Sequence, residues 1–170
     1  MFKRGVSPVI ATVLLLVLTI IIGSVVFSVV LPFVNEKLGE SKSCLDIFEG
    51  VEFAESRFNC FNATANGGKT GFSVKVNKDK VSAFKVSLLD TQGGSEVYEI
   101  NKDLVASIPA GLTMYGGATT LVFPSVGGQK TYVASRVYES AEISALTSSG
   151  DTCSIADIVE FEPCQADVNL

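Results

Sequence analysis

The strongest constraint on this chain is a long apolar stretch near its start. No charged residue lies between Gly5 and Glu36, and the 29 positions from Val6 to Val34 are mostly Val, Ile and Leu. A bilayer is crossed by roughly 20 such residues in a helix, whereas this run would reach about 43 Å. Because a helix that is apolar on every side is not stable alone in water, we expect lipid or similar helices around it.

Charge is distributed unevenly on the two sides of this stretch. Lys3 and Arg4 precede it, while the other 11 basic residues and all 18 acidic residues follow it. A short basic flank predicts a cytoplasmic N-terminus, with the C-terminal domain that follows the apolar stretch outside the cell. A secretory signal has only 7–15 apolar residues before a small-residue cleavage site, so the length of this run argues against a discarded signal.

Small and cyclic residues interrupt the apolar helix. A bend before the outer domain is expected, because Pro8 suits the first turn of a helix, whereas Pro32 would end or kink it near residue 31. Small residues allow helices to approach closely, although they are also tolerated in an ordinary membrane span. The candidates for such contacts are Thr12, Thr19, Gly23, Ser24 and Ser28.

The first residues also carry a family resemblance. Lys3-Arg4-Gly5 followed by Val6-Ser7-Pro8-Val9-Ile10-Ala11-Thr12-Val13-Leu14-Leu15 resembles the class III signal peptide and N-terminal helix of archaeal type IV pilins, over residues 1 to about 34. The resemblance implies that a prepilin peptidase cuts between Gly5 and Val6 and leaves the helix intact. Ile10 stands where bacterial pilins have Glu, so the charge pairing of that Glu is not implied. The Gly-rich start typical of archaeal motility-filament subunits is absent, which favours a pilin.

The resemblance implies a structural subunit of an archaeal type IV pilus-like filament, which polymerises through its N-terminal helix and serves in surface or cell adhesion. The implied partners are copies of the chain itself, the peptidase, an assembly ATPase and a membrane platform protein. The implied location is the cell surface, after a membrane-inserted precursor. The same hydropathy would also suit a single-pass anchored extracellular β-sandwich binding module that does not polymerise.

After a polar bridge at residues 35–43, the sequence changes to the two-residue period of half-buried strands. Residues 72–76 and 84–88 alternate in this way around a turn at 77–80, which predicts a hairpin. Further strands are expected at 47–53, 57–62, 96–100, 119–123, 130–138, 142–146 and 155–161. Acidic residues at three-residue spacing would also allow a helix over 45–56.

The expected fold is therefore α+β: a long hydrophobic helix followed by an antiparallel β-sandwich, immunoglobulin-like in broad architecture. The expected division is a signal peptide at residues 1–5, the helix at 6–40 and an extracellular domain at 41–170.

Four cysteines follow the apolar stretch, namely Cys44, Cys60, Cys153 and Cys164. On the extracellular side they predict two disulfides. Three pairings are open, and the short separations favour Cys44 with Cys60 and Cys153 with Cys164.

Composition argues against several functions. Histidine is absent, which removes the commonest general base and metal ligand, so we expect no enzyme, cofactor or metal site. The domain after the helix is acidic, which makes nucleic acid a poor partner. Asn62-Ala63-Thr64 is a glycosylation sequon, so Asn62, in an expected loop, is a candidate for modification.

Overall fold

A computed structural model of the chain describes residues 8–63, 67–103, 109–118 and 120–170, with only the backbone described at residues 36–41. The chain divides into two compact units, Met1–Lys42 and Ser43–Leu170. The expectation of an apolar helix followed by antiparallel sheets is confirmed.

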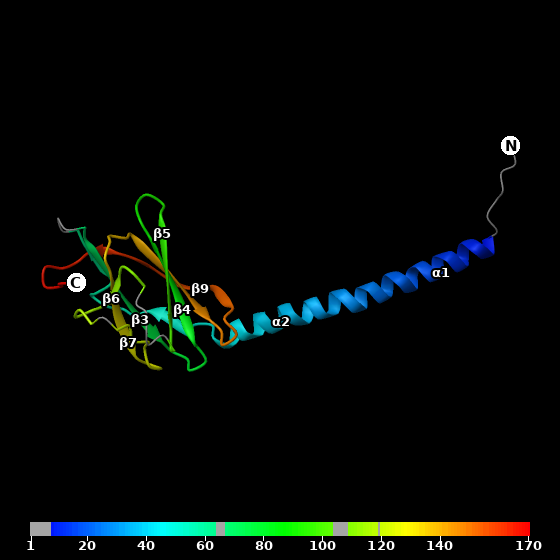
Figure 1. Cartoon of the computed structure of the whole chain (residues 1–170), viewed down its shortest axis with the longest axis horizontal. Coiled ribbons are helices and arrows are strands. Elements are labelled where there is room, and N and C mark those ends of the chain that lie inside the picture. The colour runs from blue at the N-terminus through cyan, green and yellow to red at the C-terminus, as the bar shows by residue number, and fades with distance from the viewer. Residues whose placement is uncertain (1–7, 64–66, 104–108, 119) are drawn as a thin grey trace. The chain divides into compact units, whose positions relative to one another are not determined.

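The N-terminal helix is continuous in chain order through three segments (Figure 1). They are α1 at Pro8–Val25, a π-helical segment η1 at Val26–Val30, and α2 at Leu31–Asp46. Pro8 is the first residue of α1, in the first turn, where the missing proline N–H costs nothing.

Pro32 does not end the helix, which corrects the prediction that allowed it to stop there. A proline removes one backbone donor and crowds the carbonyl four residues before it, here that of Ser28. The π-helical segment lies at this position, and such a widened turn is a known way for a helix to accommodate a local break in its hydrogen bonding. The expected polar bridge at residues 35–43 is also helical, because Glu, Lys and Leu are good helix formers.

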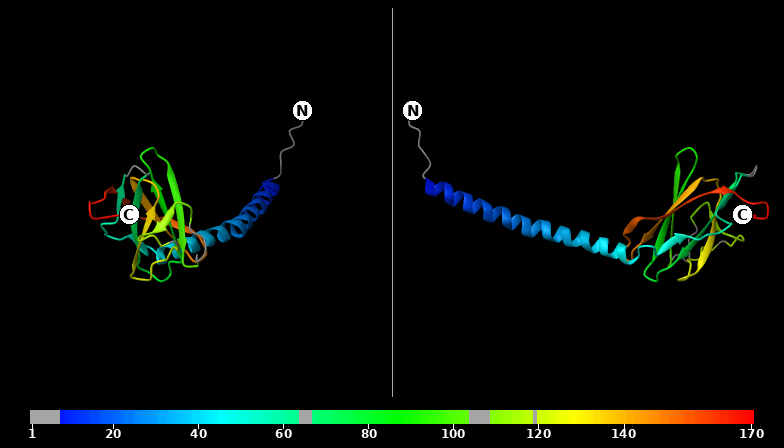
Figure 2. Two further views of the ribbon diagram at one scale, coloured as in Figure 1. Left: turned by 60° about the vertical axis from the view of Figure 1, so that its left-hand side comes forward. Right: turned by 180° about the vertical axis from the view of Figure 1, so that it is seen from behind.

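In the described part of the C-terminal unit, ten strands make up two sheets (Figures 1 and 2). The first sheet has the order β10-β2-β3-β7-β6, with β1 also paired to β3. Its strands are β1 Val51–Phe53, β2 Cys60–Asn62, β3 Lys69–Val76, β6 Leu112–Met114, β7 Gln129–Ala134 and β10 Glu162–Pro163. The second sheet has the order β5-β4-β8-β9, from β4 Ala83–Leu89, β5 Ser95–Asn101, β8 Ser140–Leu146 and β9 Thr152–Glu160. Pairing is antiparallel except between β10 and β2.

One hydrophobic core joins the two sheets. Phe72 and Tyr132 stack within the first sheet at 5.5 Å between ring centroids, and Phe84 of the second sheet meets Tyr132 edge-on at 6.1 Å. The Tyr132 hydroxyl donates a hydrogen bond to the carbonyl of Val122 at 2.8 Å, so its burial leaves no polar atom unpaired. The alternating residues of β3 and β4 predicted to face inward are fully buried, which confirms that part of the pattern.

The hairpin predicted from those same strands is wrong. β3 pairs with β1, β2 and β7, whereas β4 pairs with β5 and β8, so the connection at residues 77–82 crosses from one sheet to the other. Val81 is buried within this connection. A two-residue period specifies which face of a strand is buried but does not specify its partner.

Other strands differ from prediction in extent. Residues 120–125 have no strand, although Leu121 and Phe123 pack against the core. Only the last three residues of each expected strand at 47–53 and 57–62 pair in the sheet. The helix considered for 45–56 ends at Asp46. The short strands β6 and β10 have too few residues to show a period.

The disulfide pairing favoured by short separation is also wrong. Cys44 is bonded to Cys153 and Cys60 to Cys164. β2 runs parallel to β10, so Cys60 and Cys164 meet through tertiary structure. The sequence separations are 109 and 104 residues, and closing a loop of about 100 residues stabilises a fold by about 4.7 kcal/mol in the chain-entropy account.

Phe84→Ala should destabilise the domain by about 3–5 kcal/mol, because it leaves a cavity where the two sheets meet. Urea unfolding of the full chain in detergent, followed by near-ultraviolet circular dichroism, measures this loss. Phe48→Ala is the matched control, since Phe48 is 57% exposed and its loss should change stability by no more than about 0.5 kcal/mol. Equal losses for the two variants would contradict the placement of Phe84 in the core.

Candidate functional site

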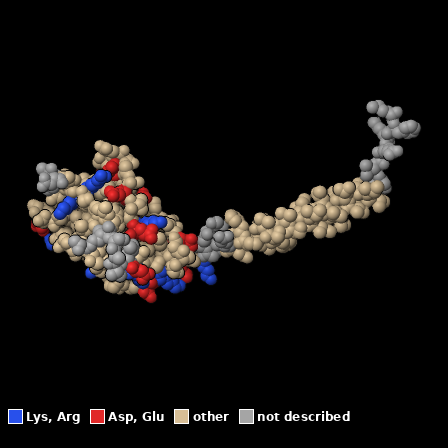
Figure 3. Space-filling model, viewed as in Figure 1, with Lys and Arg blue, Asp and Glu red and all other residues tan. Residues whose placement is uncertain are grey.

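The apolar helix is the candidate functional site. Among the described residues, Pro8–Asn35 is the one helical stretch long and apolar enough to cross a membrane, with a mean hydropathy of 3.0 and none of its residues buried. Figure 3 shows this part of the helix free of charged side chains, whereas basic and acidic groups are scattered over the C-terminal unit. A surface of this kind requires a non-aqueous environment.

The four hydroxyl side chains on this helix are all satisfied within it. Thr12 donates to the carbonyl of Val9 at 2.9 Å, and Thr19 to that of Leu16 at 2.8 Å. Ser24 and Ser28 donate in the same way to the carbonyls of Ile21 and Val25, at 2.8 and 3.2 Å. An unpaired hydroxyl in hydrocarbon would cost several kcal/mol. The helix can therefore enter lipid or a bundle of apolar helices without unsatisfied hydroxyl donors.

Three of the small residues fall on one side of α1. At 3.6 residues per turn, Thr12, Thr19 and Gly23 lie within about 40° of one another around the helix axis. Apart from the adjacent helix backbone, a Cβ atom built on Gly23 would meet no heavy atom within 4 Å, so a single chain leaves open space there. Because the hydroxyls are bonded within their own helix, close approach at this face would rely on van der Waals packing more than on interhelical hydrogen bonds.

Comparison with protein families gives a match in this same region. Residues 4–39 match the family described as archaeal type IV pilin, N-terminal. This segment is similar to archaeal type IV pilin N-terminal domains. The match supports a pilin subunit and confirms the resemblance read from the sequence. Pilins are structural rather than enzymatic proteins, and their apolar helix suggests a membrane-anchored precursor of a surface filament.

The other comparisons add little. No curated protein gave a significant match. The crystal structure of a Northeast Structural Genomics Consortium target is similar over 73% of this chain and 94% of that chain, with 11% sequence identity and a TM-score of 0.29.

The predicted cleavage residues, Lys3, Arg4, Gly5 and Val6, lie outside the described residues, so cleavage stays a prediction. Asn62 is described and is the last residue of β2 rather than part of a loop, and its side chain is half-buried. Thr64, which completes the sequon, lies outside the described residues, and glycosylation also stays a prediction.

Among the described residues, no three His, Cys, Asp or Glu side chains are grouped so that they could hold a metal ion. A partly buried polar cluster with shifted pKa values surrounds Glu96 of β5. Tyr138, in the connection from β7 to β8, donates its hydroxyl to the Glu96 carboxylate.

The electrostatics of this cluster indicate a structural role, in which the Tyr138 hydrogen bond holds the β7–β8 connection to β5. The hydrogen bond from Tyr138 lowers the pKa of Glu96. Burial, followed by the influence of Glu96, raises the pKa of Tyr98 to about 12 and that of Tyr138 further. None of these three groups therefore titrates near neutral pH, where a general base would be needed. The sequence pattern missed this contact, because 42 residues separate Glu96 from Tyr138.

Tyr138→Phe should raise the pKa of Glu96 toward its ordinary value. A carboxyl with a lowered folded-state pKa contributes stability above its unfolded pKa, and this contribution is lost as the pH falls through the folded value. The wild-type domain should thus lose stability below the ordinary Glu pKa of about 4.3, and the variant should lose less over the same acid window. Carboxyl NMR titration and urea midpoints between about pH 2 and 6 measure both effects. An unchanged pKa of Glu96 in the variant would contradict the structural role of the Tyr138 hydrogen bond.

Proposed function

We propose that this protein is the structural subunit of an archaeal type IV pilus-like extracellular filament, in which the N-terminal helices pack into a central bundle coated by the β-domains. The observation that carries the proposal is the unburied apolar helix Pro8–Asn35, within a segment that matches the pilin N-terminal family. The subunit itself performs no catalysis.

The length of the helix supports a role beyond simple anchoring. Pro8–Asn35 has 28 residues, which reach about 42 Å, against about 30 Å of hydrocarbon in a bilayer. The helical segments continue to Asp46. A helix of this length can span a membrane in the precursor and still provide a long packing surface in a filament.

Removal of the basic flank gives a physical reason for release from the bilayer. Lys3 and Arg4 hold the N-terminus at the cytoplasmic surface, and cleavage after Gly5 would remove both charges. The helix would then exchange lipid neighbours for copies of itself, which are equally apolar. Association of this kind depends on close packing rather than on the hydrophobic effect, so extraction needs an external energy source. An assembly ATPase, a membrane platform protein and a prepilin peptidase are the proposed partners.

Adhesion to surfaces or to other cells is the proposed role of the filament. The C-terminal unit would then face the outside of the cell, where two disulfides are stable. The competing function is a permanently anchored binding module, in which the helix never leaves the bilayer. Processing and assembly separate the two functions, because an anchored module requires neither.

Cells that contain a prepilin peptidase should produce mature protein that begins at Val6, recovered in filaments sheared from the surface. N-terminal sequencing of the main band and electron microscopy of the same fraction measure this. Gly5→Val should block the cut, keep the protein in the membrane fraction and abolish filaments, because the charged flank remains. Wild-type protein that still begins at Met1, and is found only in membranes, would overturn the proposed function.

Gly23→Leu should keep membrane insertion and a folded domain but reduce the yield or length of filaments. Apart from the adjacent helix backbone, a Cβ atom added at this position meets no heavy atom of the chain within 4 Å, so a steric loss would come from neighbouring helices. Val25→Phe, on roughly the opposite side of α1, is the control for added bulk and should have the smaller effect. Filaments of normal yield and length from Gly23→Leu would show that this face makes no close helix contact.

A further inference from the structure

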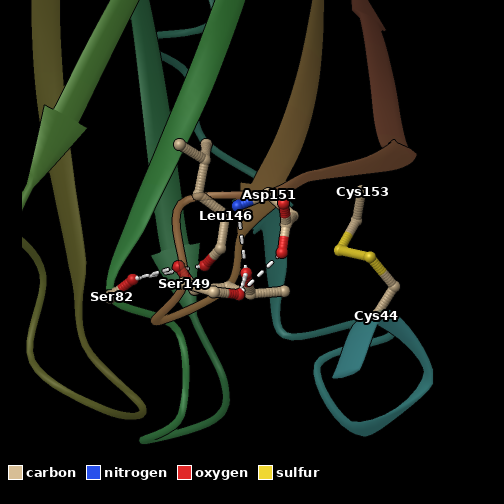
Figure 4. Close-up of a disulfide and its surroundings, with 7 residues drawn as sticks. Cys44, Ser82, Leu146, Ser149, Asp151 and Cys153 are labelled. Atoms are coloured by element: carbon tan, nitrogen blue, oxygen red, sulfur yellow. Dashed lines mark hydrogen bonds between the residues drawn. A yellow bond between two sulfur atoms is a disulfide. The ribbon is translucent and has the colours of Figure 1, made fainter. Parts of the chain in front are cut away.

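The segment that leads from α2 into the β-domain is short and is attached to β9 at two points. Cys44, in the last turn of α2, is bonded to Cys153 at the start of β9 (Figure 4). Nine residues after Cys44, the backbone N–H of Phe53 in β1 donates to the Asp157 carboxylate of β9 at 2.9 Å. β9 thus holds the entering chain once by a covalent bond and once by a hydrogen bond.

The other contacts of this entry segment, residues 45–53, are weaker than the disulfide. Ile47 is buried in the core. Lys78 donates to the carbonyl of Phe48 at 2.6 Å, and Lys80 pairs with Asp46 at 2.9 Å. The Lys80 and Asp46 side chains are largely exposed, and exposed ion pairs contribute little. Exposed side-chain contacts of this kind break readily under load.

The two strands at this junction differ greatly in how firmly they are held. β1 has three residues and pairs only with β3. β9 has nine residues and pairs with β8, which in turn pairs with β4 over all of Ser140–Leu146. A force that reached β1 first would act on the less firmly anchored of these two strands, whereas a force that reached β9 would be shared with the second sheet.

We propose that the Cys44–Cys153 disulfide is a mechanical junction bond, which transfers tension from the helix to β9 and keeps residues 45–59 folded while the filament is stretched. That the helix carries tension in the cell follows only from the proposed filament function. The mechanical effect of the bond belongs to the single chain and does not require a filament.

The second disulfide provides a matched control. Cys60–Cys164 closes a loop of 104 residues, against 109 for Cys44–Cys153, so the two bonds restrict the unfolded chain almost equally. Their positions differ. Without Cys44–Cys153, tension on the helix must pass through residues 45–59, including β1, before it reaches the cross-link at Cys60. Without Cys60–Cys164, Cys44 remains bonded to β9.

The test is single-molecule pulling of the full chain in detergent, between a handle at the N-terminus and a second handle in the exposed turn at residues 91–94, between β4 and β5. Three proteins are compared: the wild type, Cys44→Ala with Cys153→Ala, and Cys60→Ala with Cys164→Ala. The helix should extend alike in all three and serves as an internal reference. Before the domain unfolds, the Cys44/Cys153 variant should show an added extension of up to about 50 Å, from 15 residues at 3.3–3.6 Å each.

Neither the wild type nor the Cys60/Cys164 variant should show this early step, and the urea midpoints of the two double variants should be similar. An early step in the Cys60/Cys164 variant, or its absence in the Cys44/Cys153 variant, would overturn the proposal. Shear of assembled filaments gives a separate measurement. Filaments of the Cys44/Cys153 variant should break, or lose protein, sooner than wild-type filaments. Failure of the wild type to form filaments would instead refute the proposed function and leave the pulling result standing.

Discussion

The structure depends on one constraint: an apolar helix whose entire described surface from Pro8 to Asn35 is unburied must be kept out of water. Its hydroxyl groups bond to its own backbone, so the helix can enter lipid or a bundle of like helices without leaving these donors unpaired. Lipid and a bundle of like helices both provide apolar neighbours for the surface of this helix. A protein that moves between them needs no change in the helix itself, only a change in what surrounds it.

The C-terminal unit is stabilised differently, by a hydrophobic core and two disulfides of its own. A single core shared by two sheets, centred on Phe72, Phe84 and Tyr132, provides the burial. Two disulfides with separations above 100 residues close most of the domain into covalent loops. One of them stands where the helix enters, so a single bond both limits the unfolded chain and determines which strand receives a force from the helix.

Local pattern predicted the elements better than their partners. The apolar run, the pilin-like start and the buried faces of β3 and β4 were all predicted from residues close together in the sequence. The partners of β3 and β4, the disulfide pairing and the Glu96–Tyr138 contact were not predicted, because each depends on segments brought together only by folding. The prediction that Pro32 could end the helix was wrong, because the helix accommodates this proline through a local π-helical turn and continues.

The sequence alone determined that this chain has an uncharged helix too long for a discarded signal, a basic flank before it and an acidic, cysteine-containing β-domain after it. Those properties follow from composition and period, which are local. The tertiary structure alone decided that Cys44 is bonded to β9 rather than to Cys60, and that β3 and β4 belong to opposite sheets. The physical reason is that side-chain period fixes which face of a strand is buried, whereas pairing is fixed by the packing of the whole domain.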